Sequence, residues 1–551
     1  MTRAAKDHRR LVRASRIAVA ALATGLLALA APAMASAQGQ LFTVTTTKDG
    51  DDHECSNDCT LREAMSLADS ANGNSVSVPP GVYKLTLGRE LVARNNVTVF
   101  GTGTFNGQGA SARTTIIDAG GTSRVINVPG NQLAFLAGVT LTGGRAPTGG
   151  GALVGNNGAL YLYNSVVDGN VATGRGGGVD VASGSLLLAN ATISGNHAGA
   201  NGGGVAIESQ GDVVGQVSTI SGNSATASGG GISSVGHFTL LNATVAGNSA
   251  ASGGGLFVES GSAGGDDLTN TIVAGAGSGG ACGGAMALEG RFSWTGNLAD
   301  DGTCGFTLTQ GRSNLDPMLA ALTNNGGPTD TRALRAGSPA IDTGDTQRCF
   351  QGDQRGAAYV GPCDIGAFEF GGKPPEPVVP PPEAGKSVNV YTKSGHVRVK
   401  VKGSDSFFDL NDLQQIPVGS TIDTTRGKVT FKAAGKSKAW LYEGLFKFGQ
   451  THAKKPLTTL TLTGKLQCGG AGKANAAFRK KRRRHLWGNG KGKFTTRGRN
   501  SAATVLGTKW LVEDRCDGTL TKVKRGTVRV RDFKRHKTVI VKAGHSYFAK
   551  R

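Results

Sequence analysis

Short apolar runs separated by glycine, serine and asparagine follow one another through the first two thirds of the chain. The stretch GGGVDVASGSLLLANATISGNHA, which starts at Gly176, contains the runs Val179–Val181, Leu186–Leu188 and Thr192–Ile193. None of these runs is long enough for a helix or has helical spacing. Three short strands joined by three turns make one winding of a parallel β-helix, so this pattern predicts an all-β chain.

A fixed repeat supports that prediction. A Gly-Gly-Gly triplet begins at residues Gly149, Gly176, Gly202, Gly229 and Gly253, at intervals of 27, 26, 27 and 24 residues. A Gly-Asn pair precedes four of the triplets: Gly169–Asn170, Gly195–Asn196, Gly222–Asn223 and Gly247–Asn248. Such a period is the signature of a stacked repeat, whose core closes only when several windings stack.

Each repeated position has an expected role. The aliphatic side chains beside each triplet should point into the core: Val179, Val181, Val205, Ile207, Leu256 and Val258. The glycines fit turns with positive φ and close contacts between windings. The repeated asparagines fit a hydrogen-bonded ladder. The Asn-x-Thr triplets at Asn96, Asn190 and Asn242 are interpreted as part of the same architecture.

The N-terminus has the pattern of a secretory signal. Arginines precede an apolar run from Ile17 to Ala31, and Ala35-Ser36-Ala37 fits a cleavage site, so residues 1–37 are expected to be removed. The alternative is a membrane anchor, although Gly25 and Pro32 break the run. We therefore expect a secreted or cell-surface bacterial protein with no transmembrane segment in the mature chain.

Cysteine usage agrees with export. The eight cysteines fall in neighbouring pairs, which favours four disulfides paired in sequence order, although eight cysteines allow many connectivities. A zinc site made of Cys55, Cys59 and His53 is the alternative for the first pair. The disulfide candidates are Cys55, Cys59, Cys282, Cys304, Cys349, Cys363, Cys468 and Cys516.

The charge is divided unevenly along the chain, whose formal net charge is +22. From Lys386 onward there are 38 lysines and arginines and 9 acidic residues, whereas the preceding mature part holds 16 basic and 28 acidic residues. The Pro-rich stretch 371–386 separates the two parts and should be an extended linker. Alternating runs in 387–551, such as Val397–Val401, predict a small antiparallel β domain.

A helix is expected ahead of the first winding. Thr60-Leu61-Arg62-Glu63 has the form of a capping box, in which Thr60 and Glu63 satisfy free backbone amides. The apolar stripe that follows has helical spacing, and Asn72-Gly73 should end the helix. This helix would lie over the first winding, so residues 38–91 are expected to form an N-terminal cap. The stripe comprises Leu61, Ala64, Met65 and Ala68.

Both ends of residues 42–370 resemble known sequences. CTLREAMSLADSAN, from Cys59, resembles the CSLREA motif of secreted bacterial β-helix proteins. NNGGPTDTRALRAGSPAIDTGD from Asn324, DQRG from Asp353 and CDIGAFEF from Cys363 resemble the choice-of-anchor Q segment of the same proteins. The resemblance implies a right-handed parallel β-helix over 92–370, exported and often surface-associated. It implies no established chemistry.

The basic domain resembles the extracytoplasmic FecR-type domain. The similar segments are Ile416–Ile422, Thr504–Trp510, Arg525–Val530 and Val541–Gly544, and the match covers residues 388–549. The resemblance implies a small β domain of the kind found in envelope sensors. Because the transmembrane helix and cytoplasmic part of such a sensor are missing, a binding module is favoured over a sensor.

A six-residue basic run interrupts this domain. The run is Arg479, Lys480, Lys481, Arg482, Arg483 and Arg484. It is interpreted either as a solvated, mobile loop or as an electrostatic anchor for anionic wall polymer or lipid headgroups. Nucleic acid is the disfavoured partner, because an exported protein rarely meets it.

Candidate catalytic residues are few. Glu208 and Glu259 follow their triplets at equal distance, with Val235 at the same place in the winding between them. Two windings separate the glutamates by about 9.6 Å, near the upper limit for an inverting glycosidase pair. Asp180 should project outward nearby. No lysine, arginine or tyrosine joins these acids from the nearby strand positions, so catalysis is disfavoured.

One acidic loop is a weak candidate for calcium, and no other cofactor is expected. Its oxygen ligands would come from Asp49, Asp51, Asp52, Glu54 and Asp58. A short Cys55–Cys59 disulfide would order the same loop without a metal. The favoured function is therefore non-catalytic binding or adhesion to a polysaccharide or cell-wall polymer. The alternatives are a secreted polysaccharide lyase or glycoside hydrolase and an envelope sensor.

Overall fold

The computed structural model describes most of the chain after the predicted signal segment, which lies outside the described residues. The described residues are 39–55, 58–69, 74–102, 111–260, 266–285, 293–307, 309–375, 379–404, 406–410, 413–466, 468, 484–505 and 507–551. Across these ranges, no helix has both the length and the apolar character needed to cross a membrane.

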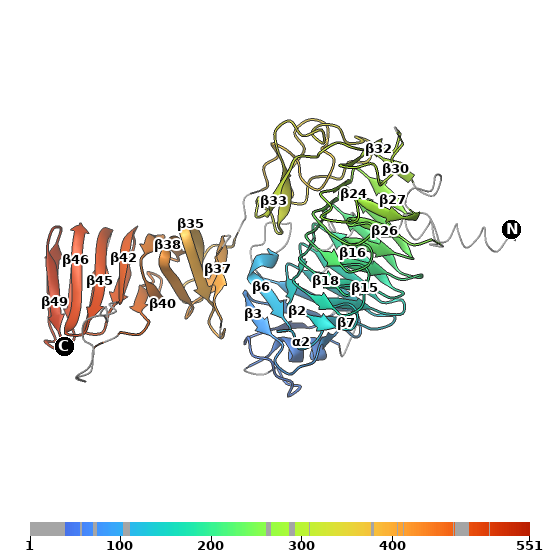
Figure 1. The fold of residues 1–551 in the computed structure, drawn as a ribbon. Helices are drawn as coiled ribbons and strands as arrows, with labels where there is room; N and C mark the ends of the chain where they lie inside the picture. The colour runs from blue at the N-terminus through green and yellow to red at the C-terminus, as the bar shows by residue number, and fades with distance from the viewer. Residues whose placement is uncertain are drawn as a thin grey trace, which may run out of the picture.

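A parallel β-helix occupies the first part of the structure (Figure 1). Its strands form four sheets, each running along the stack of windings. Sheet A contains β1 (Leu41–Thr43), β2 (Ser75–Val78), β5 (Val97–Gly101), β8 (Leu133–Ala137), β12 (Ala159–Tyr163), β16 (Ser185–Ala189), β20 (Asp212–Gln216), β24 (His237–Leu241), β27 (Asp267–Thr269) and β30 (Ser293–Thr295). Sheet B contains β3 (Gly81–Lys84), β6 (Thr115–Asp118), β9 (Thr140–Thr142), β13 (Val166–Asp168), β17 (Thr192–Ser194), β21 (Thr219–Ser221), β25 (Thr244–Ala246), β28 (Ile272–Ala274), β31 (Asn297–Ala299) and β32 (Gly311–Arg312).

The other two sheets are built from shorter strands. Sheet C contains β4 (Leu91–Val92), β7 (Ile126–Val128), β11 (Ala152–Val154), β15 (Val179–Val181), β19 (Val205–Ile207), β23 (Ile232–Ser234), β26 (Leu256–Val258) and β29 (Cys282–Gly284). Sheet D contains β10 (Arg145–Ala146), β14 (Val171–Ala172), β18 (His197–Ala198) and β22 (Ser224–Ala225). In sheet C, Val179 pairs with Val205, which pairs with Ile232. The triplets therefore lie on successive windings, and the β-helix prediction is confirmed.

The core of the β-helix is a continuous column of aliphatic side chains. All six side chains expected to point inward are buried, with Val179, Val181 and Leu256 showing no exposed surface. They belong to one hydrophobic cluster that reaches from Val44 to Cys304. Apolar burial along this column is therefore the main stabilising contribution to the stack.

Two different constraints require glycine in each triplet. The first glycine adopts positive φ, as at Gly202, where φ is 68°. At the second glycine a side chain has no room, because a Cβ on Gly203 would lie 2.4 Å from the Gly230 carbonyl oxygen of the next winding. The backbones of neighbouring windings thus approach more closely than any other residue permits.

The repeated asparagines form the expected ladder at the turn between sheets B and D. The side-chain oxygen of Asn196 accepts from the backbone N–H and the Nδ2 of Asn170, both at 3.0 Å. Asn223 and Asn248 continue the ladder, and all four side chains are buried. Every member satisfies backbone groups that the turn would otherwise leave unpaired.

A second asparagine column lies at the corner between sheets A and B. Asn164, Asn190, Asn242 and Asn270 occupy this corner with φ between 49° and 52°. Val217 holds the same place in one winding with φ of 40°. A β-branched residue is rarely found in this conformation, so Val217 is a strained position.

The helix α2 (Leu61–Ala68) covers the first winding. Thr60 and Glu63 form the predicted capping box, and the predicted apolar stripe is buried within the β-helix core cluster. The expected end at Asn72-Gly73 was wrong, because the helix ends at Ala68 with Asp69 as its C-cap. Residues 70–73 lie outside the described residues. A 3-10 turn, Ala112–Thr114, is present further along the chain.

The C-terminal part is a separate antiparallel β domain with its own core. Its single sheet is antiparallel except between β41 and β43, which pair in parallel. The strands are β35 (Ser387–Lys400), β36 (Phe408–Asp409), β37 (Gln414–Pro417), β38 (Thr421–Ala433), β39 (Ser437–Tyr442), β40 (Leu445–Gln450), β41 (Thr458–Leu462), β42 (Arg484–Lys491), β43 (Phe494–Arg497), β44 (Ser501–Val505), β45 (Thr508–Arg515), β46 (Gly518–Arg525), β47 (Thr527–Asp532), β48 (Thr538–Lys542) and β49 (Ser546–Lys550).

The C-terminal domain lies beside the N-terminal end of the β-helix, near β3 (Figure 1). The Thr47 N–H and hydroxyl both donate to the Gly403 carbonyl at 3.4 Å, and Val82 packs against the core of the C-terminal domain. The chain therefore returns from the far end of the β-helix before the second domain begins.

Four disulfides join the cysteines in sequence order. They are Cys55–Cys59, Cys282–Cys304, Cys349–Cys363 and Cys468–Cys516. This is the pairing expected from the sequence, and it excludes the alternative zinc site at the first pair. Disulfides of this number fit an oxidising compartment outside the cytoplasm.

Candidate functional site

The outer face of sheet B is not available to a ligand over several windings, because residues 319–370 cover it. This segment, which we call the strap, contains β33 (Leu319–Thr323) and β34 (Thr331–Leu334). The Thr192 hydroxyl donates to the Asp330 carbonyl at 2.7 Å, and the Thr219 hydroxyl donates to the Gln354 Oε1 at 2.6 Å. The column of threonines that would face solvent is thereby buried under the strap.

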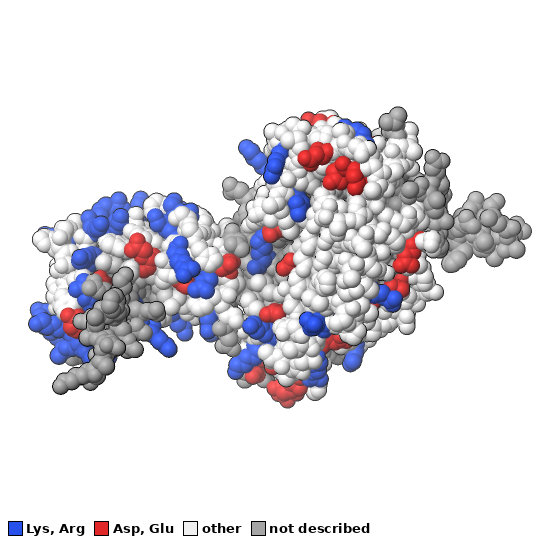
Figure 2. All heavy atoms as spheres, viewed as in Figure 1, with Lys and Arg blue, Asp and Glu red and all other residues white. Residues whose placement is uncertain are grey.

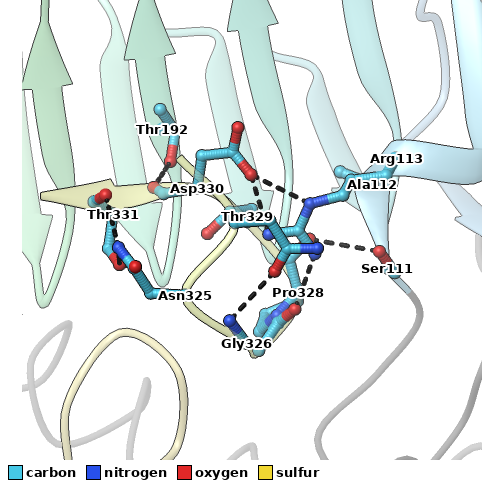
Figure 3. Close-up of polar contacts among 12 residues, drawn as sticks. Ser111, Ala112, Arg113, Thr192, Asn325, Gly326, Pro328, Thr329, Asp330 and Thr331 are labelled. Atoms are coloured by element: carbon cyan, nitrogen blue, oxygen red, sulfur yellow. Dashed lines mark hydrogen bonds and ion pairs between the residues drawn. The ribbon is translucent and has the colours of Figure 1, made fainter. Parts of the chain in front are cut away.

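The strap also forms hydrogen bonds and an ion pair with residues of the early windings (Figure 3). The Arg113 Nε donates to the Asp330 carboxylate at 2.9 Å, and its other nitrogens lie within 2.8 Å of Asp330 and the Gly327 carbonyl. The Ala112 N–H and the Ser111 hydroxyl donate to the Pro328 carbonyl. These contacts join segments more than 200 residues apart in sequence, so the strap has a structural role.

The DQRG motif inside the strap forms its own buried ion pair. Arg355 contacts the Asp353 carboxylate at 2.6 Å and donates to the carbonyls of Glu369 and Gly372. Burial is the main cause that raises the pKa of the Glu369 carboxyl, to about 7. These charged groups are buried and contact one another, so they stabilise the strap itself.

The candidate catalytic acids gather on sheet C around an arginine. The Arg175 Nε lies 2.8 Å from the Glu208 Oε1 and 3.7 Å from the Asp180 Oδ2. Arg175 immediately precedes the triplet at Gly176, and its turn folds over β15 of the same winding. The sequence expectation considered only strand positions and so did not include this arginine. The turn before a triplet, rather than the strand, supplies the partner.

Asp180 is outside the core but is not open to solvent. Its exposed fraction is 1%, because the backbone of the triplet turn packs on it. Burial raises the pKa of the Asp180 carboxyl, and the nearby Arg175 opposes that effect. A carboxylate in this position cannot reach a polymer that lies on the surface.

Glu208 is the most accessible of the acids in ion-pair contact with Arg175. One quarter of its side chain is exposed, and burial of the remainder raises the pKa of its carboxyl, with Arg175 opposing and Asp180 and Glu259 adding to the rise. Glu259 is half-buried and lies 3.5 Å from the Asn201 Nδ2. The cluster therefore places three acids around one arginine, and Glu208 and Asp180 are the two in ion-pair contact with it.

Two aspartates of the acidic loop in the cap form ion pairs with arginines. Arg62 pairs with the Asp49 carboxylate at 2.9 Å, and Arg89 pairs with Asp51. The Asp52 carboxylate accepts the Glu54 N–H, and Asp58 is exposed. Within the part of the chain that the structure describes, no three His, Cys, Asp or Glu side chains are placed to hold a metal ion. This geometry does not favour the calcium interpretation.

Most of the basic run lies outside the described residues. Only Arg484 is described, at the start of β42, where its Nε lies 2.8 Å from the buried Asp514 carboxylate. Arg484 therefore anchors a strand instead of reaching into solvent. The other five residues of the run lie outside the described residues, and their expected roles stay predictions.

Positive charge covers the C-terminal domain outside that run. Figure 2 shows lysine and arginine side chains over the visible face of this domain, whereas the visible surface of the β-helix is mainly neither basic nor acidic. Nine acidic residues cannot neutralise 38 basic ones after Lys386. The domain therefore presents an excess of cations that is available to an anionic partner.

Comparisons with known proteins add little to this description. No protein-family model and no curated protein matches the chain. Among solved structures, the crystal structure of pectate lyase Pel9A is similar, with 12% sequence identity, a TM-score of 0.36, and coverage of 60% of this chain and 97% of that chain. A likeness this distant carries no argument about activity. Strand pairing within the chain itself defines the class, a parallel β-helix followed by an antiparallel β domain.

Proposed function

We propose that this is an exported envelope protein that binds an anionic polysaccharide or wall polymer without cleaving it. The basic C-terminal domain supplies most of the attraction, and the β-helix is a long, rigid body joined to it. In this proposal residues 38–91 are a CSLREA-type cap, the strap is a choice-of-anchor Q segment, and residues 387–551 are a FecR-like domain.

The uncompensated positive charge of the C-terminal domain carries this proposal. Because its strands alternate inward apolar and outward basic residues, the cations are held on the surface by the fold itself. In β47, for example, Val528 and Val530 are buried while Arg529 and Arg531 are exposed. A polyanion would release counterions on binding such a surface, so the attraction should weaken as salt rises.

Retention on isolated cell walls tests the proposal. The full chain and a chain ending at residue 385 are compared at low and high salt. The full chain should be retained at low salt and released at high salt, and the shortened chain should be retained poorly at both. Equal retention of the two chains, or no effect of salt, would contradict the proposal.

A second function has one observation in its favour. Glu208 is partly exposed, its carboxyl has a raised pKa, and a second glutamate lies two windings away. This arrangement has elements of a polysaccharide hydrolase or lyase. The Arg175 contact weighs against it, because Glu208 is held in an ion pair. Turnover of a glycan that Glu208→Gln abolishes would establish the enzyme instead.

A further inference from the structure

Four aromatic side chains share the outer face of the sheet in the C-terminal domain. Tyr442 pairs across the strands with Trp487, and Trp440 pairs with Thr430, which in turn pairs with Tyr391. The pleat directs the intervening Leu441 into the core, so Trp440 and Tyr442 both face outward. Strands β35, β39 and β42 thus place these rings on one surface.

A lysine lies over each of these rings. Lys393 is 4.2 Å from the ring centroid of Trp440, and Lys428 is 5.0 Å from that of Tyr442. Lys524 and Lys432 lie over Trp487 and Tyr391 at 5.2 Å and 5.7 Å. We call these eight residues the aromatic–lysine face: Tyr391, Trp440, Tyr442, Trp487, Lys393, Lys428, Lys432 and Lys524.

The core of the domain does not require these rings. Trp510 shows how the fold uses tryptophan structurally, because it is fully buried and its Nε1 donates to the Thr496 hydroxyl at 2.9 Å. Trp440, in contrast, is 37% exposed. The rings of Tyr442 and Trp487 are stacked, with planes parallel within 6° and centroids 6.2 Å apart. Aromatic rings outside the core, each with a lysine over it, have the chemistry of a binding site for a ligand that carries both apolar and anionic groups.

Resting on the proposed function, we propose that the aromatic–lysine face is the site that binds a linear acidic polysaccharide. Carboxylates along the polymer pair with the lysines, and the C–H faces of pyranose rings pack on the aromatic surface that the lysines leave uncovered. Adjacent strands are about 4.8 Å apart, so rings on neighbouring strands can contact successive parts of one chain. Single-stranded nucleic acid also stacks on aromatic rings. The disulfides and the predicted signal segment favour a partner outside the cell.

Variants of the full chain test the site with polygalacturonate, a linear polymer of uronic acid. The double substitution Trp440→Ala with Trp487→Ala should weaken binding at least tenfold, whereas Trp440→Tyr with Trp487→Tyr should preserve most of it. Lys393→Gln with Lys524→Gln should weaken binding and reduce its dependence on salt. The matched control is Phe533→Ala, which removes a ring that also carries a cation, Arg497, at 5.3 Å but lies off this face.

The outcomes separate this site from the proposed function. Salt-sensitive binding that is equally strong in the alanine variant would overturn the site and leave the proposed function intact. Absence of binding by the unaltered chain to polygalacturonate and to cell walls would contradict the proposed function as well. Tighter binding of a single-stranded oligonucleotide than of polygalacturonate, lost in the same alanine variant, would overturn the polysaccharide assignment. Unchanged melting temperatures show that each variant is folded.

Discussion

Asn223 accepts two hydrogen bonds from Asn196, which lies one winding earlier in the stack. Its Oδ1 receives the Asn196 backbone N–H at 3.0 Å and the Asn196 Nδ2 at 2.9 Å. Its own Nδ2 donates to the Ile193 carbonyl and to the Asn248 Oδ1, both at 3.0 Å. One buried amide therefore connects three windings.

Removing this amide should destabilise the β-helix strongly. We expect Asn223→Ala to lower the free energy of unfolding by about 3 kcal/mol or more, because several buried partners lose their hydrogen bonds together. Asn156→Ala is the control, since Asn156 also accepts from the next winding, at Ser183, but is exposed. Chemical denaturation measures both variants. Similar small losses in the two would show that the buried ladder is not a main source of stability.

The triplet glycines should tolerate substitution least where windings touch. We expect Gly203→Ala to be severely destabilising, because its Cβ would lie 2.4 Å from two carbonyl oxygens. Gly222→Ala should cost only about 1–2 kcal/mol, since Gly222 has positive φ but nothing near its Cβ position. Thermal unfolding of the two variants gives the comparison. The reverse order of melting temperatures would contradict the tight stacking of the backbones.

Relief of strain at one corner should stabilise the chain. Val217 adopts φ of 40° in a column where the neighbouring windings have asparagine. Because asparagine tolerates this conformation better than a β-branched residue does, we expect Val217→Asn to stabilise by about 1 kcal/mol. The same substitution at the core position Val213, which is fully buried in a strand, should destabilise instead. A lower melting temperature for Val217→Asn would disprove the strain.

The stability of the N-terminal cap should depend on pH through the carboxyl of Asp69. Burial is the main cause that raises the pKa of its carboxyl, to about 7, while the Arg94 N–H and charge oppose the rise. An ordinary aspartate has a pKa of about 4 in an unfolded chain, so the folded state keeps its proton longer. The resulting stability is complete below about pH 4 and is lost as the pH rises toward 7. Asp69→Asn should therefore reduce the loss of melting temperature between pH 5 and pH 8, and an unaltered profile would contradict this role.

Local patterns made the winding predictable. The spacing of Gly149, Gly176 and Gly202 and the asparagines before them reflect contacts that repeat in every winding, so the sequence repeats where the geometry repeats. The capping box of Thr60 and Glu63 was equally predictable from the sequence, because both partners lie within one helical turn. Disulfide order followed from cysteines that are neighbours in sequence.

Contacts between segments that are distant in sequence were less predictable. Nothing near Thr192 indicates that Asp330 and Gln354 cover it, because those residues lie more than 130 positions away. Arg175 was not predicted for a different reason: the pattern of acids repeats at strand positions, whereas Arg175 belongs to a turn. The aromatic–lysine face could have been found from the alternation in the segment Ser437–Tyr442, where Trp440 and Tyr442 occupy outward positions. Its partners on β42 and β46 become neighbours only through the sheet order.

The proposed function requires that the chain binds an acidic polymer and leaves it intact. The direct test follows binding and product release together, with the full chain and polygalacturonate, at low and at high salt. We expect binding that weakens as salt rises, with no new chain ends formed. Release of cleaved product by the unaltered chain, abolished by Glu208→Gln, would contradict it.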